Sequence, residues 1–325
     1  LFACGIIIAI RVLTLGAPNL LNPDWSVLNG LGYLWNPDLS SLRDAKVWLA
    51  AAGQILFTLS VGIGVILTYA SYLKKTDDVV LSGLTAASTN EFAEIILGSS
   101  IVIPAAFAFF GPHEIGEIAK GGAFNLGFVT MPLIFQKIAF SAFFGCAWFT
   151  LLFLAGITSS VSLAQPSIAF LEDEFNISKK KAVIIFGIVA FILCQPAIFF
   201  LKNGVVNELD FWGGTFCLVL FAAIETILFA WIFGMEKAWE EIHHGADMKL
   251  PYIYKFIIKY VTPLFLILIL IAWSYQQGIP ILLMKGISQL DKPYILGIRL
   301  MLLLLFLGLA ILVKIAWQKR KNTKK

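Results

Sequence analysis

Residues 57–72 read FTLSVGIGVILTYASY. It belongs to an apolar run over 47–73, which exceeds the roughly 20 residues that a helix needs to cross a bilayer. Four small or polar residues interrupt the middle of the run: Thr58, Ser60, Gly62 and Gly64. Small residues allow close packing of a continuous helix. Alternatively, they mark a break into half-helices whose exposed ends bind ions and charged groups.

The composition of the whole chain predicts a membrane protein. Of the 325 residues, 59% are hydrophobic and 14% are charged, and the mean hydropathy is +0.87. A soluble domain carries about 25% charged residues, so this chain lacks the polar surface of that class. The net charge of +4 does not indicate a nucleic-acid partner, because the basic residues cluster in loops and in the tail. The four cysteines lie mostly in apolar runs and indicate small buried side chains.

The apolar runs predict an all-α bundle that crosses the membrane several times. Seven full runs have the limits 47–73, 79–111, 140–171, 181–202, 209–234, 252–276 and 292–317. A shorter run over 1–15 precedes them, and Leu1 is not a methionine. We therefore expect the chain to begin partway through a helix of a longer protein. The long connections 16–46 and 112–139 carry short amphipathic patterns, which predict structured caps over one face.

Lysine and arginine predict the orientation, because cytoplasmic loops carry an excess of both. One set of connections, with the tail, holds twelve basic residues: Lys74, Lys75, Lys179, Lys180, Lys181, Lys237, Lys249, Lys319, Arg320, Lys321, Lys324 and Lys325. The opposite set holds seven: Arg43, Lys46, Lys120, Lys137, Lys202, Lys285 and Lys292. We expect the richer set in the cytoplasm of a cell inner (plasma) membrane, with the C-terminal tail 318–325 on that side. The tail KRKNTKK would then anchor to acidic lipid.

Polar residues inside the apolar runs are candidates for a site. Asn90 and Glu94 lie four residues apart in the run 79–111 and share a helix face, whereas Glu91 lies on a different face. A carboxylate at this depth costs at least ~2.5 kcal/mol on insertion scales, so it usually faces a cavity or a partner. A purely structural, hydrogen-bonded glutamate is the alternative.

The run 140–171 contains a second polar pattern. Ala155, Thr158, Ser159 and Ser162 follow helical spacing and form one stripe of small side chains and hydroxyls. Such a stripe is typical of a packing seam between helices. It also suits a hard cation, which binds oxygen ligands. The three histidines, His113, His243 and His244, lie in predicted loops, and no nucleotide, nucleophile or zinc motif occurs.

The segment 47–111 closely resembles the sixth and seventh helices of the neurotransmitter:sodium symporter family, especially its bacterial amino-acid transporters. It reads VWLAAAGQILFTLSVGIGVILTYASYLKKTDDVVLSGLTAASTNEFAEIILGSSIVIPAAFAFFG. The likeness continues through LAGITSSVSLAQPSIAFLEDE, NELDFWGGT and FGMEKAWEEI. It implies an inverted five-plus-five repeat of twelve helices. This chain would hold part of the fifth helix through the twelfth, lacking the first four, with a discontinuous sixth helix over 47–73.

The resemblance also implies two sodium sites. Thr58 and Asn90 would bind the first ion. The carbonyl of Ala155 and the hydroxyls of Thr158 and Ser159 would supply part of the second. Glu94 stands where chloride-dependent members have a serine that helps to bind chloride, which predicts no chloride requirement. A fixed carboxylate there would offset the sodium charge.

The substrate and gate positions follow from the same resemblance. Phe57 would be an aromatic lid, and the wall around a bound amino acid would be formed by Thr58, Ser60, Ile63, Ser159 and Leu163. Family members often have an aromatic residue at the position of Ile63. The gate residues would be Gln54 and Asp210 on the outside and Tyr72 and Asp173 on the cytoplasmic side.

These features predict a sodium-coupled symporter of a neutral, hydrophobic amino acid that works by alternating access. Its partners would be the amino acid, the lipid bilayer and a second copy of the chain in a homodimer; no nucleic acid is expected. One rival is a non-transporting sensor or scaffold with the same fold, against which the retained Thr58, Asn90, Thr158 and Ser159 argue. A multi-pass membrane enzyme is the other rival, but the sequence shows no reactive constellation for it.

Overall fold

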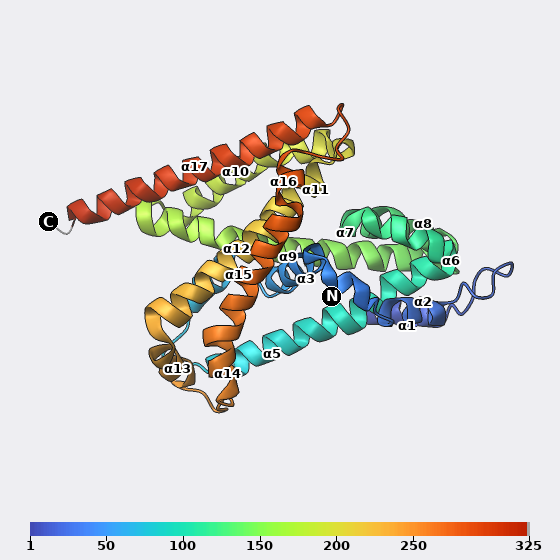
Figure 1. Cartoon of the computed structure of the whole chain (residues 1–325), viewed down its shortest axis with the longest axis horizontal. Coiled ribbons are helices and arrows are strands. Elements are labelled where there is room, and N and C mark those ends of the chain that lie inside the picture. The colour runs from blue at the N-terminus through green and yellow to red at the C-terminus, as the bar shows by residue number, and fades with distance from the viewer. Residues whose placement is uncertain (324–325) are drawn as a thin grey trace. The chain divides into compact units, whose positions relative to one another are not determined.

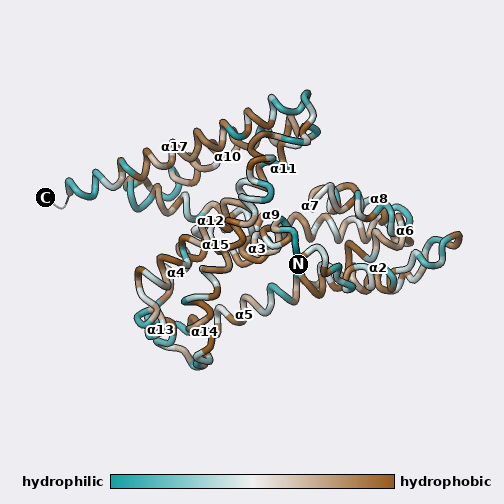
Figure 2. Tube along the Cα trace, in the orientation of Figure 1, coloured by the Kyte–Doolittle hydropathy of each residue, from teal (hydrophilic) through white to brown (hydrophobic). Residues whose placement is uncertain are grey.

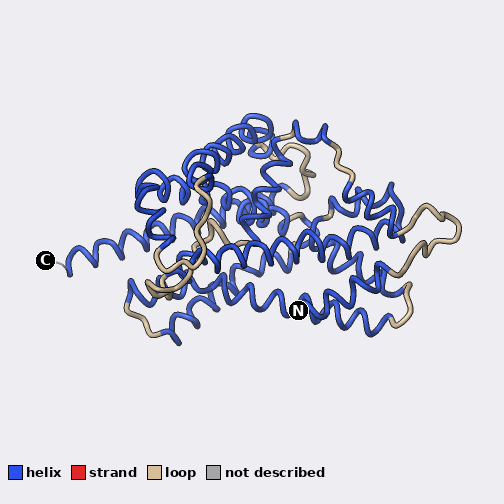
Figure 3. Tube along the Cα trace, turned by 90° about the horizontal axis from the view of Figure 1, so that it is seen from below, coloured by secondary structure: helices blue, strands red, loops and turns tan. Residues whose placement is uncertain are grey.

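The structure is a computed structural model that describes residues 1–323, and the elements in that range are helices joined by loops and turns (Figures 1 and 3). Two compact units make up the chain. The first comprises Leu1–Leu42 and Leu81–Val161, and the second comprises Arg43–Val80 and Ser162–Lys325. Lys324 and Lys325 of the predicted tail lie outside the described residues.

The first unit contains short helices and one long kinked helix. Its elements are α1 (Phe2–Leu13), α2 (Val27–Trp35), α5 (Val79–Glu91), a π-helical segment (Phe92–Gly98), α6 (Ser99–Lys120), α7 (Gly122–Asn125), a π-helical segment (Leu126–Thr130), α8 (Met131–Gln136) and the first part of α9 (Ser141–Phe175). A 3-10 turn (Leu39–Arg43) reaches the boundary of the second unit. The α6 helix bends at Gly111, where φ is 80° and ψ is 173°, just before Pro112.

The core of the first unit is apolar and tightly packed. Ile8 on α1, Ala105 on α6 and Ile134 on α8 are all fully buried in one cluster. Gly30 on α2 permits a close approach to α6, because a Cβ there would lie 2.7 Å from the Cα of Pro104. A larger residue at this position would push α2 away from α6.

The second unit contains the remaining elements. They are α3 (Ala45–Thr58), α4 (Val65–Ala70), the rest of α9, α10 (Lys179–Phe199), a 3-10 turn (Leu201–Asn203), α11 (Val205–Leu209), α12 (Cys217–Ile227), α13 (Met235–His243), α14 (Ile253–Phe256), α15 (Thr262–Trp273), α16 (Ile279–Leu282) and α17 (Lys292–Thr323). Four π-helical segments connect helices within it: Asp210–Phe216, Leu228–Gly234, Ile257–Val261 and Ser274–Gly278. Leu49 of α3, Val219 of α12 and Leu266 of α15 form the centre of its main core.

Six helical stretches are long and apolar enough to cross a membrane. They are Val79–Ala119, Ser141–Phe175, Lys179–Phe199, Val205–His243, Ile253–Leu282 and Lys292–Asn322. The run 47–73 is absent from this set, because it is divided into α3 and α4, neither of which reaches the length of a span. Five of the six stretches extend beyond the predicted limits by several residues. In four of them charged side chains continue the helix past the apolar run, whereas the stretch Ile253–Leu282 continues with uncharged residues.

Candidate ion and substrate site

The break in the run 47–73 is the centre of the candidate site. Helix α3 ends at Thr58 and α4 begins at Val65. The backbone of Ser60, Gly62 and Gly64 has φ of 58°, 81° and 76°. Glycine adopts positive φ without steric cost. Gly62 is needed for a second reason, because a Cβ there would lie 2.7 Å from the carbonyl oxygen of Leu218 on α12.

The backbone groups released by the break find partners nearby. The N–H of Val61 donates to the carbonyl of Leu56 at 2.9 Å. The N–H of Gly62 donates to Oε2 of Glu225 on α12 at 3.1 Å. Since unpaired backbone is costly away from water, this carboxylate stabilises the broken conformation directly.

A cavity of about 480 Å³ lies beside the break. Its walls are Gly62, Ile63 and Gly64 from the break and one face of the opposite helical stretch, formed by Gly213, Cys217, Leu218, Phe221 and Glu225. Among these described lining residues, Glu225 alone carries a charge. The unwound backbone therefore borders a space with one fixed carboxylate.

Thr58 and Thr158 share one geometry. The Thr58 hydroxyl donates to the carbonyls of Gln54 and Ile55, at 3.1 and 3.2 Å. The Thr158 hydroxyl donates to the carbonyls of Leu154 and Ala155, at 2.8 and 3.1 Å. Each hydroxyl thus directs its hydrogen into its own helix.

Asn90 and Glu94 lie where α5 passes into the π-helical segment Phe92–Gly98. The Asn90 amide donates to Oε2 of Glu94 over 3.5 Å, so the two side chains do meet. Asn90 also lines a cavity of about 740 Å³ together with the hydroxyl residues Ser82, Thr85 and Thr89. π-helical segments inside α-helices occur frequently at functional sites.

The predicted sodium ligands and pocket residues are divided between the two compact units. Asn90, Glu94, Ala155, Thr158 and Ser159 belong to the first unit. The second unit holds Phe57, Thr58, Ser60, Ile63 and Leu163. Neither unit by itself contains all the ligands predicted for the first sodium ion.

The predicted gate residues belong to the second unit. Gln54 is on α3, which packs against the π-helical segment that begins at Asp210. Both side chains are exposed. Tyr72 is 65% exposed just beyond α4, and Asp173 is exposed on α9. On the same side of the break, the hydroxyl of Tyr69 donates to Oγ of Ser162 at 2.9 Å, which ties α4 to α9.

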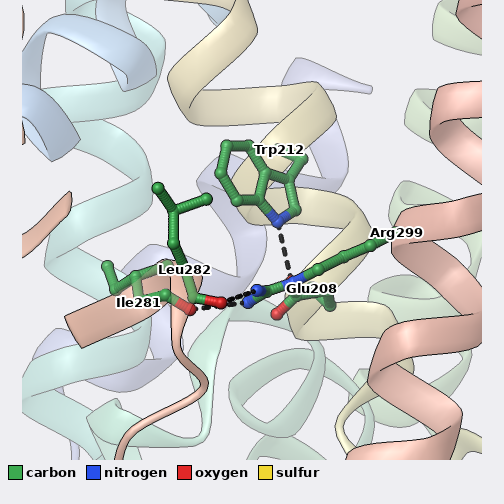
Figure 4. A network of polar contacts seen from close by, with 5 residues as sticks. All are labelled: Glu208, Trp212, Ile281, Leu282 and Arg299. Atoms are coloured by element: carbon green, nitrogen blue, oxygen red, sulfur yellow. Dashed lines mark hydrogen bonds and ion pairs between the residues drawn. The ribbon is translucent and has the colours of Figure 1, made fainter. Parts of the chain in front are cut away.

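An ion pair that the sequence analysis missed lies two residues before Asp210. Glu208 is 9% exposed, and its Oε1 accepts from Nε1 of Trp212 at 2.7 Å and from Nε of Arg299 on α17. The two Nη atoms of Arg299 donate to the carbonyls of Leu282 and Ile281, each at 3.0 Å (Figure 4). Arg299 therefore joins α11, which holds Glu208, to the end of α16.

The sequence analysis missed both Glu225 and the Glu208–Arg299 pair, although each had a signal in the sequence. Glu225 and Arg299 are charged residues inside the predicted runs 209–234 and 292–317, and Glu208 immediately precedes one of these runs. Charged residues within a span face partners or cavities, and this holds for these three residues as it does for Glu94.

Comparison with known proteins identifies the family. The sequence profile of the Sodium:neurotransmitter symporter family matches residues 19–315. The chain belongs to this family. An uncharacterized sodium-dependent transporter of Methanocaldococcus jannaschii is 30% identical over 242 residues, which are 74% of this chain and 49% of that protein. The sodium-dependent dopamine transporter of Bos taurus is 26% identical, over 72% of this chain and 34% of its own length.

A solved structure agrees with the family. The crystal structure of MhsT in complex with L-phenylalanine matches with a TM-score of 0.71 and 27% identity, over 83% of this chain and 59% of that one. The family and the helical transporter fold expected from the sequence are thereby confirmed, and the chain is a multi-pass membrane protein of a sodium-dependent transporter family. It spans about half the length, or less, of the curated relatives it matches.

Proposed function

We propose that the full-length protein couples the inward movement of sodium to that of a neutral, hydrophobic amino acid, by alternating access and without chloride. The observation that carries this proposal is the division of α3 from α4 at residues 59–64, with Thr58 at its edge. Membership of a sodium-dependent transporter family supports the same function.

Two sodium ions would bind to oxygen ligands. Thr58 and Asn90 supply the first site, and Ala155, Thr158 and Ser159 contribute to the second. The hydroxyls of Thr58 and Thr158 fit this role, because their hydrogens already bond within their helices. Each sodium ion releases ~2.3 kcal/mol per 100 mV of membrane potential, so two ions would drive substantial accumulation of substrate.

The choice of substrate and the independence from chloride are inferred from the charge and polarity of the residues at the proposed site. Phe57, Ile63 and Leu163 line the proposed pocket without charge, with Ser60 and Ser159 beside them, which favours an apolar side chain. The related MhsT structure holds L-phenylalanine, a neutral and apolar amino acid. Glu94 would provide a permanent negative charge near the first sodium ion and replace a chloride ion.

Alternating access needs gates on both sides of the pocket. We assign Gln54 and Asp210 to the outer gate and Tyr72 and Asp173 to the cytoplasmic gate.

The distribution of lysine and arginine predicts that the C-terminus lies in the cytoplasm, at the inner membrane. A homodimer is the assembly to test, by measuring the mass of the purified protein in detergent.

The test is a sodium titration of amino-acid binding to the full-length protein. We expect Thr58→Ala and Asn90→Ala each to raise the sodium concentration needed for half-maximal binding, because each removes an oxygen ligand. Thr226→Ala is the matched control, since the Thr226 hydroxyl also donates to a carbonyl of its own helix, at 2.7 Å, but lies outside the proposed sites. Binding in chloride-free buffer should be unchanged.

An unchanged sodium titration in both site variants would overturn the ligand assignment. A substrate screen over the amino acids tests the specificity separately. Binding of charged amino acids in preference to apolar ones would contradict the assignment of the pocket wall.

A further inference from the structure

A cavity of about 460 Å³ lies at one end of the helical stretch 205–243, away from the break. Its walls come from the π-helical segment Leu228–Gly234, the first turn of α13 and Lys259. The helix is interrupted between these walls, because Gly234 has φ of 97° and ψ of 125°. All of these residues belong to the second unit.

This end of the stretch is where the chain changes from apolar to charged. Residues 228–234 read LFAWIFG, and α13 continues as MEKAWEEIH. Ile232 is 72% exposed and Phe233 is 52% exposed, so the apolar side faces outward. Figure 2 shows the corresponding change in hydropathy toward α13. In a membrane protein such a change marks the boundary between hydrocarbon and headgroups.

Two lysines give the cavity a positive charge. Glu236 in its wall forms a salt bridge with Lys255, which offsets the charge of the glutamate. Lys237 and Lys259 also line the cavity, and neither forms a salt bridge with another residue in the described range 1–323. The Lys259 ammonium also lies over the ring of Tyr260, 5.3 Å from its centroid, a contact that leaves its N–H groups able to bind an anion together with Lys237.

An interfacial tryptophan holds the two sides of the cavity together. Nε1 of Trp231 donates to the carbonyl oxygen of Lys259 at 2.7 Å, which joins the stretch 205–243 to the stretch 253–282. The Trp231 ring is 45% exposed. Tryptophan is enriched at the level of the headgroups, because its ring is apolar and its N–H is polar.

We infer that this cavity binds the phosphate group of an anionic phospholipid, with Lys237 and Lys259 as its ligands and the acyl chains along Ile232 and Phe233. Basic pockets between membrane helices bind acidic headgroups through this combination of charge and depth. The lipid source is favoured over a soluble phosphate, since the apolar residues beside the lysines have no use in binding a free ion. The inference does not depend on the transported substrate.

The test uses the full-length protein in nanodiscs of phosphatidylcholine that contain phosphatidylglycerol. The quantity measured is the enrichment of phosphatidylglycerol among the lipids retained after extraction into detergent, by mass spectrometry. We expect enrichment in the native protein. Lys237→Gln and Lys259→Gln should each lower it about fivefold, as expected for loss of one basic residue at a membrane surface.

Two further variants and one competitor complete the experiment. Lys249→Gln makes the same charge change in the loop after α13, outside the cavity, and should leave the enrichment unchanged. Lys259→Arg keeps the charge and should retain the lipid. Native enrichment in both glutamine variants, or an equal loss in Lys249→Gln, would overturn the inference. Displacement of the lipid by millimolar glycerol phosphate would also overturn it, since it would indicate a site for a soluble anion.

Discussion

Two carboxylates on the same helical stretch, Glu208 and Glu225, have opposite surroundings. Glu208 is almost fully buried and accepts hydrogen bonds from Arg299 and Trp212. Glu225 is half-buried, lines a cavity and accepts from the backbone N–H of Gly62. The first carboxylate therefore fixes helices to one another, whereas the second stabilises a segment without regular structure. Stability and function are thus assigned to different positions on one stretch, which the following substitutions can test.

The largest effect is expected at the Glu208–Arg299 pair. Arg299→Leu leaves a buried carboxylate without its counter-charge and the carbonyls of Ile281 and Leu282 without donors. Loss of one partner of a buried pair costs about 3–5 kcal/mol. The measurement is the thermal unfolding midpoint of the full-length protein in detergent.

Two controls separate this pair from a general effect of removing arginine. Arg43→Leu makes the same change at an exposed position and should leave the midpoint almost unchanged. The double variant Glu208→Leu with Arg299→Leu should recover part of the lost stability, because no unpaired charge remains. If Arg299→Leu unfolds no earlier than Arg43→Leu, the pair does not contribute to stability.

A smaller effect is expected at Gly62 in the break. Gly62→Ala places a Cβ in a left-handed backbone conformation, which costs about 1–3 kcal/mol, and 2.7 Å from the carbonyl oxygen of Leu218. We expect a lower unfolding midpoint together with weaker amino-acid binding.

Gly83→Ala is the matched control for Gly62. Gly83 lies in α5, and no atom would lie within 4 Å of an added Cβ. Alanine is favoured over glycine in a helix by about 1 kcal/mol, so stability should be equal or higher. Equal behaviour of the two variants would contradict a special role for the conformation of Gly62.

The contrast between Glu208 and Glu225 also shows which features of the molecule the sequence could predict. Apolar length predicted the helical membrane fold, because hydrocarbon requires satisfied backbone over a fixed distance. The glycine and hydroxyl pattern of residues 58–64 indicated a break as one of two alternatives. The partner of that break, Glu225, lies 163 positions away from Gly62, and local patterns contain no information on such pairing. The same limit applies to Arg299, which meets Glu208 across 91 positions.

The site itself was less predictable than the fold. Helical spacing placed Thr158 and Ser159 in one stripe, but a packing seam produces the same pattern. The π-helical segment Phe92–Gly98 changes the helical register directly after Asn90, and periodicity at 3.6 residues does not anticipate such a change. The assignments of sodium ligands, pocket wall and gates therefore remain predictions.

The smallest effect is expected between two substitutions at Glu225, and their difference tests whether this side chain acts as a hydrogen-bond acceptor for the break. Glu225→Ala removes the acceptor of the Gly62 N–H, and a hydrogen bond to a charged group contributes about 1.5–3 kcal/mol. Glu225→Gln keeps an oxygen at nearly the same position and should lose less than Glu225→Ala, because a neutral acceptor still contributes about 1 kcal/mol. The unfolding midpoint and the affinity for the amino acid should follow the order native, glutamine, alanine. If glutamine is as damaging as alanine, the negative charge of Glu225 in its cavity matters more than the bond to the backbone.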